Sequence, residues 1–338
     1  MGIETEFRAI VVDRTENAEG KKAQSAALRV VDDGFLMPGD VTIAVDYSSI
    51  NYKDGLALMG RPGVVRAWPL IAGIDLVGTV EQSADPRWSV GDPVILNGAG
   101  LSESHHGGLA ERARVSGDFL VRLPQGISAV QAAAIGTAGF TAMLSVIGLE
   151  RGGVTPESGT VLVTGAAGGV GSVAVVLLAA RGYQVHASTG RIDELGDYLR
   201  GLGAVELVDR ATLSEAGKPL QGQRWAGAVD SVGSVTLANV LAQTNYGGTV
   251  TACGLAQGAD LPATVMPFIL RAVSLIGINS VEAPLPQREE AWRRLATDLD
   301  LSLLDHLTQV IPLEAAFDAA AGILAGTVHG RTVVDVRR

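Results

Sequence analysis

A glycine-rich turn in the middle of the chain is the first stretch whose residue types could do chemistry. The segment from Val161 to Ser172, VLVTGAAGGVGS, passes from β-branched residues into glycines and then resumes as an apolar run, which predicts a strand, a tight turn and a helix start. Backbone N–H groups and the helix dipole at such a turn can hold a phosphate, and glycines let the chain approach it closely. By itself the turn fits either a phosphate site or a tight connection in an α/β sheet.

The glycine spacing decides between two kinds of nucleotide site. A P-loop would need a lysine and a hydroxyl residue at the end of the turn, whereas here Gly171 is followed directly by Ser172. The spacing instead matches a dinucleotide turn that opens a helix toward a pyrophosphate. The residues predicted to bind the cofactor in this turn are Thr164, Gly165, Ala167, Gly168, Gly169, Val170 and Gly171.

The end of the next predicted strand favours NADPH over NADH. It reads Ser188, Thr189, Gly190 and Arg191, with no acid before Asp193. A carboxylate at this place would bind the ribose hydroxyls of NAD and repel a 2′-phosphate, whereas hydroxyls and a guanidinium would bind that phosphate. We therefore predict that these four residues hold the 2′-phosphate of NADPH. In the alternative interpretation, Arg191 is an ordinary exposed arginine at a helix start.

Composition limits the partners and the compartment. The chain has 338 residues, 47% of them apolar, 43 glycines and a formal net charge of −10, so nucleic acid would be repelled overall. The single cysteine, Cys253, excludes disulfides within the chain and thiolate zinc clusters. The N-terminus lacks the pattern of a signal peptide, and the apolar run from Val173 is too short to span a bilayer. We expect a cytoplasmic protein without a membrane or nucleic-acid partner.

The pattern of elements predicts an α/β protein with two domains. Residues 1–128 read as short strands separated by glycine and proline turns, which favours a β-barrel-like unit. Residues 129–281 alternate strands and helices, which is typical of a doubly wound parallel Rossmann sheet and here of an NADPH-binding domain. Residues 282–338 contain two amphipathic helices and a final strand, which we expect to return to the first domain.

The glycine turn also fits the short-chain dehydrogenases. Those enzymes need a Tyr-x-x-x-Lys pair well after the turn for proton transfer. The tyrosines beyond the turn are Tyr183, Tyr198 and Tyr246, and none is followed by lysine four residues later. A first domain of this size, residues 1–128, is also foreign to the short-chain dehydrogenases, so we reject that class.

A series of motifs resembles the medium-chain dehydrogenase/reductase superfamily over essentially the whole chain. These motifs are GIDLVGTV, GDPVILNG, GGLAERARV, AAAIGTAGFTAM and the glycine turn, in that order. Zinc-dependent members bind a catalytic metal through cysteine and histidine ligands. The corresponding stretches SSINYKD and AGIDLVG contain neither residue, so we expect no metal and place the chain with the zinc-free quinone and enoyl reductases.

Within that branch, the stretches SSINYKDGLALMGR, ERARVSGDFLVRLP and MPFILRAVSLIGINSV resemble the acrylyl-CoA reductase group. This resemblance implies a GroES-like catalytic domain and NADPH-dependent reduction of the C=C bond of acryloyl-CoA to propanoyl-CoA. Two alternatives stay open. The protein could be an NADPH:quinone oxidoreductase, or a non-enzymatic NADPH-binding redox sensor.

The resemblance also implies a reaction segment, NYKD, beside the nicotinamide. Hydride addition to the β-carbon leaves an enolate that needs hydrogen-bond donors and a proton. Asn51 and Tyr52 are the predicted catalytic residues, with Tyr52 also touching the cofactor; Asn51 could instead be a helix N-cap and Tyr52 a half-buried core aromatic. Lys53 and Asp54 are a possible charged pair, and we expect Asp54 to be structural.

Several further residues complete the predicted site, which is expected in the cleft between the two domains. Arg61 and Arg66 follow the reaction segment and are candidates for the phosphates of the acyl-CoA substrate, although most surface arginines bind nothing. Gly254 and Leu255 are expected to meet the nicotinamide half of NADPH, and Arg331 to reach the cofactor. Resemblance further implies a homodimer paired through the edge of the Rossmann sheet. We expect His105 and His106 to be surface or packing residues, with a proton relay as the alternative, and Cys253 to be buried and inert.

Overall fold

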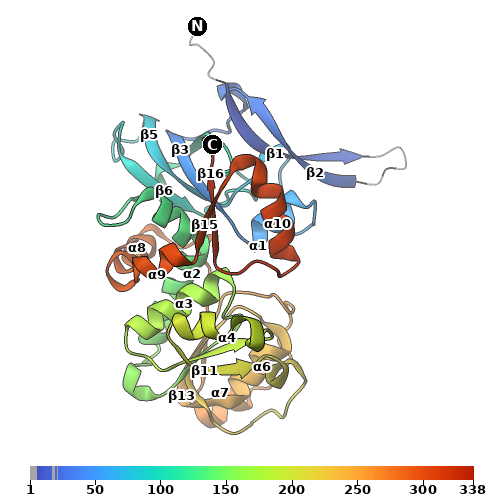
Figure 1. Ribbon diagram of the computed structural model, residues 1–338, viewed down its shortest axis with the longest axis vertical. Helices are drawn as coiled ribbons and strands as arrows, with labels where there is room; N and C mark the ends of the chain where they lie inside the picture. The colour runs from blue at the N-terminus through green and yellow to red at the C-terminus, as the bar shows by residue number, and fades with distance from the viewer. Residues whose placement is uncertain (1–5, 17–19, 21) are drawn as a thin grey trace. The chain divides into compact units, whose positions relative to one another are not determined.

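The protein is represented by a computed structural model, which describes residues 6–16, 20 and 22–338. The chain divides into two compact units, each with its own core (Figure 1). The first, named the β-rich unit, is made of residues 1–137, 280–296 and 304–338. The second, named the Rossmann unit, is made of residues 138–279 and 297–303.

A seven-stranded sheet forms the centre of the β-rich unit. Its strands follow the order β15-β16-β3-β5-β6-β8, and β7 also pairs with β3. Their bounds are β3 Val41–Ile50, β5 Asp75–Ser83, β6 Pro93–Asn97, β7 Arg112–Val115, β8 Val121–Arg122, β15 Thr308–Pro312 and β16 Arg331–Asp335. Alternate residues of β3, namely Val41, Ile43 and Val45, are fully buried because successive side chains of a strand point to opposite faces.

The C-terminal segment completes this sheet. Strand β16 pairs antiparallel with β3, with Thr332 opposite Ile50, and pairs parallel with β15 (Figure 1). Residues 282 positions apart in the sequence, Ile50 and Thr332, are therefore neighbours. This pairing brings the start of β16 beside the end of β3, immediately before the reaction segment.

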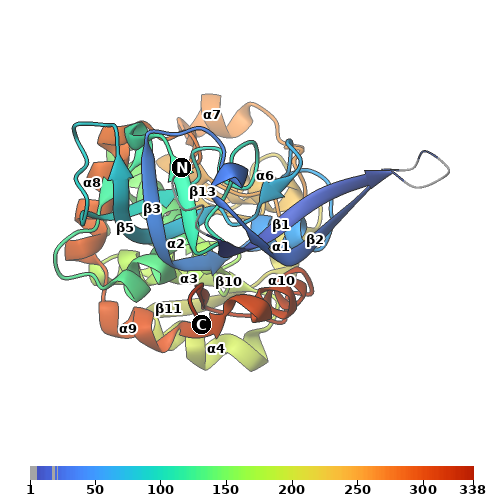
Figure 2. The same cartoon turned by 90° about the horizontal axis from the view of Figure 1, so that it is seen from above.

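A smaller sheet supports the first helix of the β-rich unit. It has the order β2-β1-β4, with bounds β1 Phe7–Glu16, β2 Lys22–Val31 and β4 Leu70–Ile71. Figure 2 shows β1 and β2 as a long two-stranded ribbon with helix α1 (Tyr52–Leu58) alongside. The Gln24 amide on β2 donates to the Ala57 carbonyl at 2.9 Å, which attaches the helix to this ribbon.

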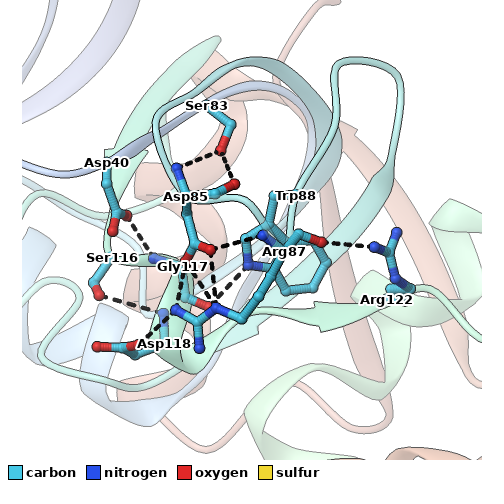
Figure 3. Close-up of polar contacts among 9 residues, drawn as sticks. All are labelled: Asp40, Ser83, Asp85, Arg87, Trp88, Ser116, Gly117, Asp118 and Arg122. Carbon is cyan, nitrogen blue, oxygen red and sulfur yellow. Dashed lines mark hydrogen bonds and ion pairs between the residues drawn. The ribbon is translucent and has the colours of Figure 1, made fainter.

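A polar corner closes another part of the β-rich unit (Figure 3). The Trp88 indole N–H donates to the Gly117 carbonyl at 3.0 Å, and Arg87 donates to the Asp85 carboxylate. The Arg87 guanidinium holds the pKa of Asp85 below its usual range. A Cβ at Gly117 would lie 2.3 Å from Asp85 Oδ2, so this corner requires glycine there. These contacts join residues 85–88 to Gly117 and give this corner a structural role.

The Rossmann unit contains a six-stranded sheet in which every neighbouring pair is parallel. Its order is β11-β10-β9-β12-β13-β14, which is the 3-2-1-4-5-6 order of a dinucleotide-binding fold. The bounds are β9 Val161–Val163, β10 Val185–Thr189, β11 Ala204–Asp209, β12 Trp225–Asp230, β13 Thr244–Ala252 and β14 Ser274–Gly277. Every residue of β12 is buried, as expected for a parallel strand covered on both faces.

Helices connect the strands of the two units. The α-helices besides α1 are α2 Ala129–Arg151, α3 Gly169–Ala180, α4 Ile192–Gly201, α5 Ala211–Ser214, α6 Ser234–Gln243, α7 Met266–Arg271, α8 Leu285–Asp298, α9 Leu301–His306 and α10 Ala316–Leu324. The short 3₁₀ helices are η1 Asp33–Phe35, η2 Gly117–Phe119, η3 Pro156–Ser158 and η4 Leu313–Ala315.

Helix α2 has 23 residues and is long and apolar enough to cross a membrane. Of its most apolar window, however, 94% is buried inside the protein, which fits a core helix. Gly136 interrupts the helix with a φ of 49°. A Cβ at Gly136 would lie 2.8 Å from Asp75 Oδ2 and 2.9 Å from Arg331 Nη2, so the helix is broken where it meets a buried polar cluster.

Candidate functional site

The cofactor turn, Thr164–Gly171, has the strand, turn and helix that its sequence predicts. Gly165 has a φ of 59°, and a Cβ there would lie 2.5 Å from Ser231 Oγ. Gly168 is the N-cap of helix α3, and a Cβ at Gly171 would lie 2.3 Å from the Gly165 carbonyl oxygen. Larger residues would therefore open the turn. The first N–H groups of a helix have no partner within the helix, and Gly168 supplies no side-chain cap, so those of α3 suit an anion at this place.

The hydroxyl of Thr164, a predicted cofactor residue, makes hydrogen bonds within the protein. Its hydroxyl donates to Asp230 Oδ1 at 2.7 Å and accepts from the Ser231 N–H at 3.1 Å, which ties the end of β9 to the end of β12. The other oxygen of Asp230 accepts from the Gly233 N–H at 2.8 Å. Burial raises the pKa of Asp230. The Thr164 hydroxyl thus supports the turn, and its backbone N–H and carbonyl are likewise bonded, to the Val229 carbonyl at 3.0 Å and from Ser231 Oγ at 3.0 Å; a contact with the cofactor stays a prediction.

The end of β10 brings the predicted phosphate residues together. Ser188 and Thr189 are buried, and the Thr189 hydroxyl accepts from the Arg191 N–H at 3.2 Å. Arg191 begins helix α4, and its guanidinium lies 3.4 Å from Glu194. An exposed contact of that length is weak and leaves the guanidinium available to a stronger anion.

Arg210 is a residue that the sequence reasoning missed. It directly follows β11, and its backbone N–H donates to the Thr189 carbonyl at 3.1 Å. A Cβ at Gly190 would lie 2.8 Å from the guanidinium carbon of Arg210, so this cation packs against the phosphate segment. The signal was present in the sequence, because an arginine at the end of the third strand lies beside the end of the second strand in a Rossmann sheet.

The loop after β13 holds the other predicted cofactor residues. A Cβ at Gly254 would lie 2.3 Å from the Ser231 carbonyl oxygen, and Leu255 is 63% exposed. The Cys253 thiol donates to the Asp230 carbonyl at 3.2 Å. Burial, with a smaller contribution from the Asp230 carboxylate, raises the pKa of Cys253 to about 12. This thiol is therefore not a reactive thiolate at neutral pH.

The reaction segment, Asn51–Asp54, lies at the junction of β3 and α1. Asn51 is the N-cap of the helix, as the alternative interpretation held, and its Oδ1 accepts from the Lys53 N–H at 3.0 Å. Asp54 Oδ2 accepts in return from the Asn51 N–H at 3.0 Å, which completes a capping box. The Nδ2 atom of Asn51 is buried and has no hydrogen-bond partner among the described residues.

The side chains of Tyr52, Lys53 and Asp54 have different surroundings. The Tyr52 side chain is 52% exposed, so about half of its surface is covered, and the exposure alone does not decide between a site residue and the half-buried aromatic of the alternative interpretation. Lys53 and Asp54 do not form a pair: Lys53 Nζ lies 2.6 Å from Glu103 Oε1, because successive residues of a helix face different directions. Asp54 is instead fully buried, and burial together with the charge of Asp75 raises its pKa to about 7.

The two arginines predicted for the substrate follow the end of α1. Gly60 has a φ of 66°, and the Arg61 N–H donates to the Leu56 carbonyl at 2.8 Å, which ends the helix in a Schellman motif. Arg61 is exposed, and no ion pair involves it among the described residues. Arg66 is also exposed but lies 3.7 Å from Glu103, the partner of Lys53.

Arg331 lies in a buried cluster of the β-rich unit. Its Nε donates to the Ala134 carbonyl and its Nη2 to Ser49 Oγ at 3.3 Å. Ser49 in turn donates to Asp75 at 2.6 Å, and Asn97 donates to the other Asp75 oxygen at 2.8 Å. Arg331 is 2% exposed, and the structure gives its guanidinium these protein partners; a contact with the cofactor stays a prediction.

The two histidines singled out in the sequence, His105 and His106, are packing residues. Nδ1 of His106 accepts from the Ile71 N–H at 3.0 Å and Nε2 lies 2.8 Å from the Phe35 carbonyl, which defines a neutral imidazole with its proton on Nε2. Burial lowers the pKa of His106. His105 Nε2 lies 2.8 Å from the Arg114 carbonyl. Within the described residues no group of three His, Cys, Asp or Glu side chains is placed to hold a metal ion, and zinc independence stays a prediction.

Two family models match the chain. The alcohol dehydrogenase GroES-like domain matches residues 37–125, and the zinc-binding dehydrogenase matches residues 169–297. The acrylyl-CoA reductase AcuI of Ruegeria pomeroyi is 50% identical over 331 residues, which are 98% of this chain and 99% of the relative. The probable acrylyl-CoA reductase AcuI of Escherichia coli is 50% identical over 321 residues, 95% of this chain and 98% of the relative.

Solved structures agree with these matches. The YhdH oxidoreductase of Salmonella enterica, solved in complex with NADP, has a TM-score of 0.93 and 49% identity, and the alignment covers 97% of this chain and 99% of that one. The Bacillus subtilis protein yhfP, solved with NAD bound, has a TM-score of 0.92 and 45% identity, and covers 98% of this chain and all of that one.

A GroES-like domain and a Rossmann domain in one chain define a medium-chain dehydrogenase/reductase, and the expected fold class is confirmed. The match at 50% identity over almost the full length narrows the assignment. The chain belongs to the acrylyl-CoA reductase family.

Proposed function

We propose that this protein catalyses the NADPH-dependent reduction of the C=C bond of an α,β-unsaturated acyl-CoA, with acryloyl-CoA giving propanoyl-CoA. The observation that carries this proposal is the 50% identity, over 99% of its length, to a relative named as an acrylyl-CoA reductase. Membership of the family makes the protein an oxidoreductase, and the local geometry of the cofactor turn and the reaction segment supports the particular reaction.

The residues of the Rossmann unit fit NADPH. The turn needs glycine at Gly165 and Gly171 for steric reasons, and it leaves helix N–H groups for a pyrophosphate. Around Ser188 and Thr189, the cations Arg191 and Arg210 would hold a 2′-phosphate. Asp209, the last residue of β11, accepts from the Ala211 N–H at 2.9 Å through its Oδ1. The NAD bound in yhfP makes a direct comparison of both cofactors necessary.

The residues of the reaction segment would serve the substrate. NADPH supplies a hydride when bound. Conjugation with the thioester carbonyl makes the β-carbon of the substrate electrophilic, and hydride addition there puts negative charge on the carbonyl oxygen. The unpaired Nδ2 of Asn51 would donate to that oxygen, and the exposed Tyr52 hydroxyl would supply the proton to the α-carbon. Arg61 and Arg66 would contact the phosphates of CoA.

The test is a spectrophotometric assay of the wild-type protein. NADPH and NADH are each mixed with acryloyl-CoA, crotonyl-CoA and a quinone, and the absorbance at about 340 nm is followed. We expect consumption of NADPH with acryloyl-CoA and slower consumption of NADH, since two cations at the phosphate site favour the phosphorylated cofactor. If only the quinone consumes NADPH, the protein is a quinone reductase. Binding without turnover of any acceptor would support the redox sensor, although the raised pKa of Cys253 argues against a thiol sensor.

We further propose that the protein works as a homodimer in the cytoplasm. Strand β14 is an edge of the Rossmann sheet, and Val265 and Ile269 beside it are 65% and 71% exposed. An unpaired edge next to exposed apolar residues favours pairing with a second copy across a two-fold axis. Sedimentation of the wild type and of Ile269→Glu tests this: the wild type should sediment as a dimer, and a monomeric wild type would contradict the proposal.

A further inference from the structure

The orientation of the Asn51 amide is determined by the capping box. Lys53 N–H is a donor, so the atom of the amide that lies 3.0 Å from it must be the oxygen. The other end of the amide is therefore the NH₂ group. That group is buried and has no partner among the described residues, which leaves an amide donor ready for an acceptor from a ligand.

Asp54 holds the backbone that carries this amide. Its Oδ2 accepts from the Asn51 N–H at 3.0 Å, and its Oδ1 accepts from the Ile74 N–H at 3.0 Å. One buried carboxylate thus joins the start of α1 to the connection between β4 and β5. These two donors come from parts of the chain about twenty residues apart, so the carboxylate sets the position of Asn51 relative to the sheet.

A carboxylate suits this place for a geometric reason. Two backbone N–H groups approach the two ends of the Asp54 side chain, and each end must accept a hydrogen bond. An asparagine side chain has one oxygen and one NH₂ group, so one of its ends would face another donor. Asp54→Asn would therefore keep the size of the side chain and lose one of the two contacts.

The neighbouring buried cluster explains how a second carboxylate can lie close by. Asp75 accepts from Ser49 Oγ at 2.6 Å, from Asn97 Nδ2 at 2.8 Å and from Thr137 Oγ1 at 2.6 Å. These donors hold Asp75 in place independently of Asp54. Of these two carboxylates, Asp54 is the one that accepts from the backbone of the reaction segment.

We propose that Asp54 is the positioning residue of the reaction segment, holding the Asn51 amide so that its NH₂ group donates to the thioester carbonyl oxygen of the substrate. The inference rests on the proposed function, because it assumes that an acyl-CoA binds at Asn51. Asp54 itself does not touch the substrate. Replacing Asp54 should displace the Asn51 amide and so lower turnover, and it should leave the binding of NADPH unchanged.

A double-mutant cycle tests the inference. Asn51→Ser keeps a capping oxygen but lacks the amide donor, and Asp54→Asn disturbs the position of the amide. We measure kcat and KM with acryloyl-CoA, the Kd for NADPH by fluorescence, and the thermal unfolding of each variant. We expect kcat to fall ~100-fold in Asn51→Ser and ~10-fold in Asp54→Asn, with the Kd for NADPH changed less than about twofold. In the double variant, kcat should equal that of Asn51→Ser alone.

The matched control is Asp32→Asn. Asp32 also caps a helix of the β-rich unit, accepting from the Gly34 N–H at 2.9 Å, but it lies outside the reaction segment. Its kcat should equal that of the wild type. Multiplication of the two single effects in the double variant would overturn the inference, since Asp54 would then act independently of Asn51. If Asp54→Asn does not fold, an unchanged kcat in Asn51→Ser overturns it equally. Absence of wild-type turnover would instead contradict the proposed function.

Discussion

The cofactor turn and the reaction segment are both short, but they are held in different ways. In the cofactor turn the backbone determines the shape: Gly165 and Gly171 leave no room for a Cβ, and the nearest contacts are only a few residues away or on the adjacent strand. In the reaction segment side chains determine the shape. Asp54 reaches Ile74, and Lys53 reaches Glu103.

This difference affects what a substitution does. A Cβ at Gly171 creates a steric conflict that no side-chain movement can relieve, because the opposing atoms belong to the backbone, and at Gly165 the φ of 59° itself disfavours a larger residue. A change in the reaction segment removes a hydrogen bond or a charge and leaves the backbone free to keep its path. Substitutions in the cofactor turn should therefore abolish binding of the cofactor, whereas substitutions in the reaction segment should lower the activity by degrees.

The largest expected effect is that of Gly171→Ala. The new Cβ would lie 2.3 Å from the Gly165 carbonyl oxygen and force the turn open, so the affinity for NADPH should fall ~100-fold or more. Calorimetric titration with NADPH measures it. The matched control is Gly201→Ala in α4, where nothing lies within 4 Å of the added Cβ and the affinity should not change. Equal affinities of the two variants would remove the steric account of the turn.

Tyr52→Phe is expected to have a somewhat smaller effect, and on turnover only. Loss of the hydroxyl should lower kcat with acryloyl-CoA ~10- to 100-fold if Tyr52 supplies the proton. The fold should be preserved because the side chain is 52% exposed. Tyr246→Phe, another exposed tyrosine, is the control for removal of a hydroxyl. Unaltered kcat in Tyr52→Phe would eliminate Tyr52 as the proton donor.

Arg210→Gln should change the choice of cofactor. Removal of a cation that packs on Gly190 should raise the Kd for NADPH ~10-fold and leave the Kd for NADH unchanged, since only NADPH carries the 2′-phosphate. Fluorescence titration of both cofactors measures this. Arg200→Gln, in the last turn of α4, removes the same charge elsewhere and should have no effect. An equal loss for both cofactors would show a general effect on the turn.

Arg61→Gln and Arg66→Gln should have the smallest effects on catalysis. Arg61 has no ion pair among the described residues, whereas Arg66 shares Glu103 with Lys53. We therefore expect KM for acryloyl-CoA to rise ~3- to 5-fold in Arg61→Gln and less in Arg66→Gln. An acryloyl thioester of pantetheine, which lacks the nucleotide phosphates, is the control substrate. The same rise with that substrate would contradict a role in binding those phosphates.

The last prediction concerns the pH dependence of stability. Burial and the charge of Asp75 raise the pKa of Asp54 from 3.8 to about 7, although Arg331 opposes this. The folded state thus binds this proton more tightly than the unfolded state, so the contribution of Asp54 to stability is complete below pH about 4 and is lost as the pH rises through about 7. This rise in pKa is worth about 4 kcal/mol, so the Tm of Asp54→Asn minus that of the wild type should increase by about 5–6 °C across this range. A constant difference would contradict the raised pKa.

Residues whose partners are local could be predicted from the sequence. The doubly wound parallel sheet of the Rossmann unit followed from the alternation of strands and helices, and the role of Asn51 as an N-cap was already an alternative because the cap and its helix are adjacent in sequence. Lys53 was assigned the wrong neighbour, because its partner Glu103 lies 50 residues away and no local pattern marks it. The contact of Thr164 with Asp230, 66 residues away, likewise has no local pattern, and the role of Thr164 at the cofactor stays a prediction.

The sequence by itself determined the glycine turn, the hydroxyl and arginine pattern at Ser188–Arg191, and the family to which the chain belongs, because each depends on residue types at fixed short spacings. The tertiary structure alone decided that Lys53 pairs with Glu103 and that Asp54 joins Asn51 to Ile74. These contacts depend on which strand ends lie next to each other and on which side chains are buried there. Spacing along the chain does not encode the distance between such residues, because folding sets it through the packing of the whole sheet.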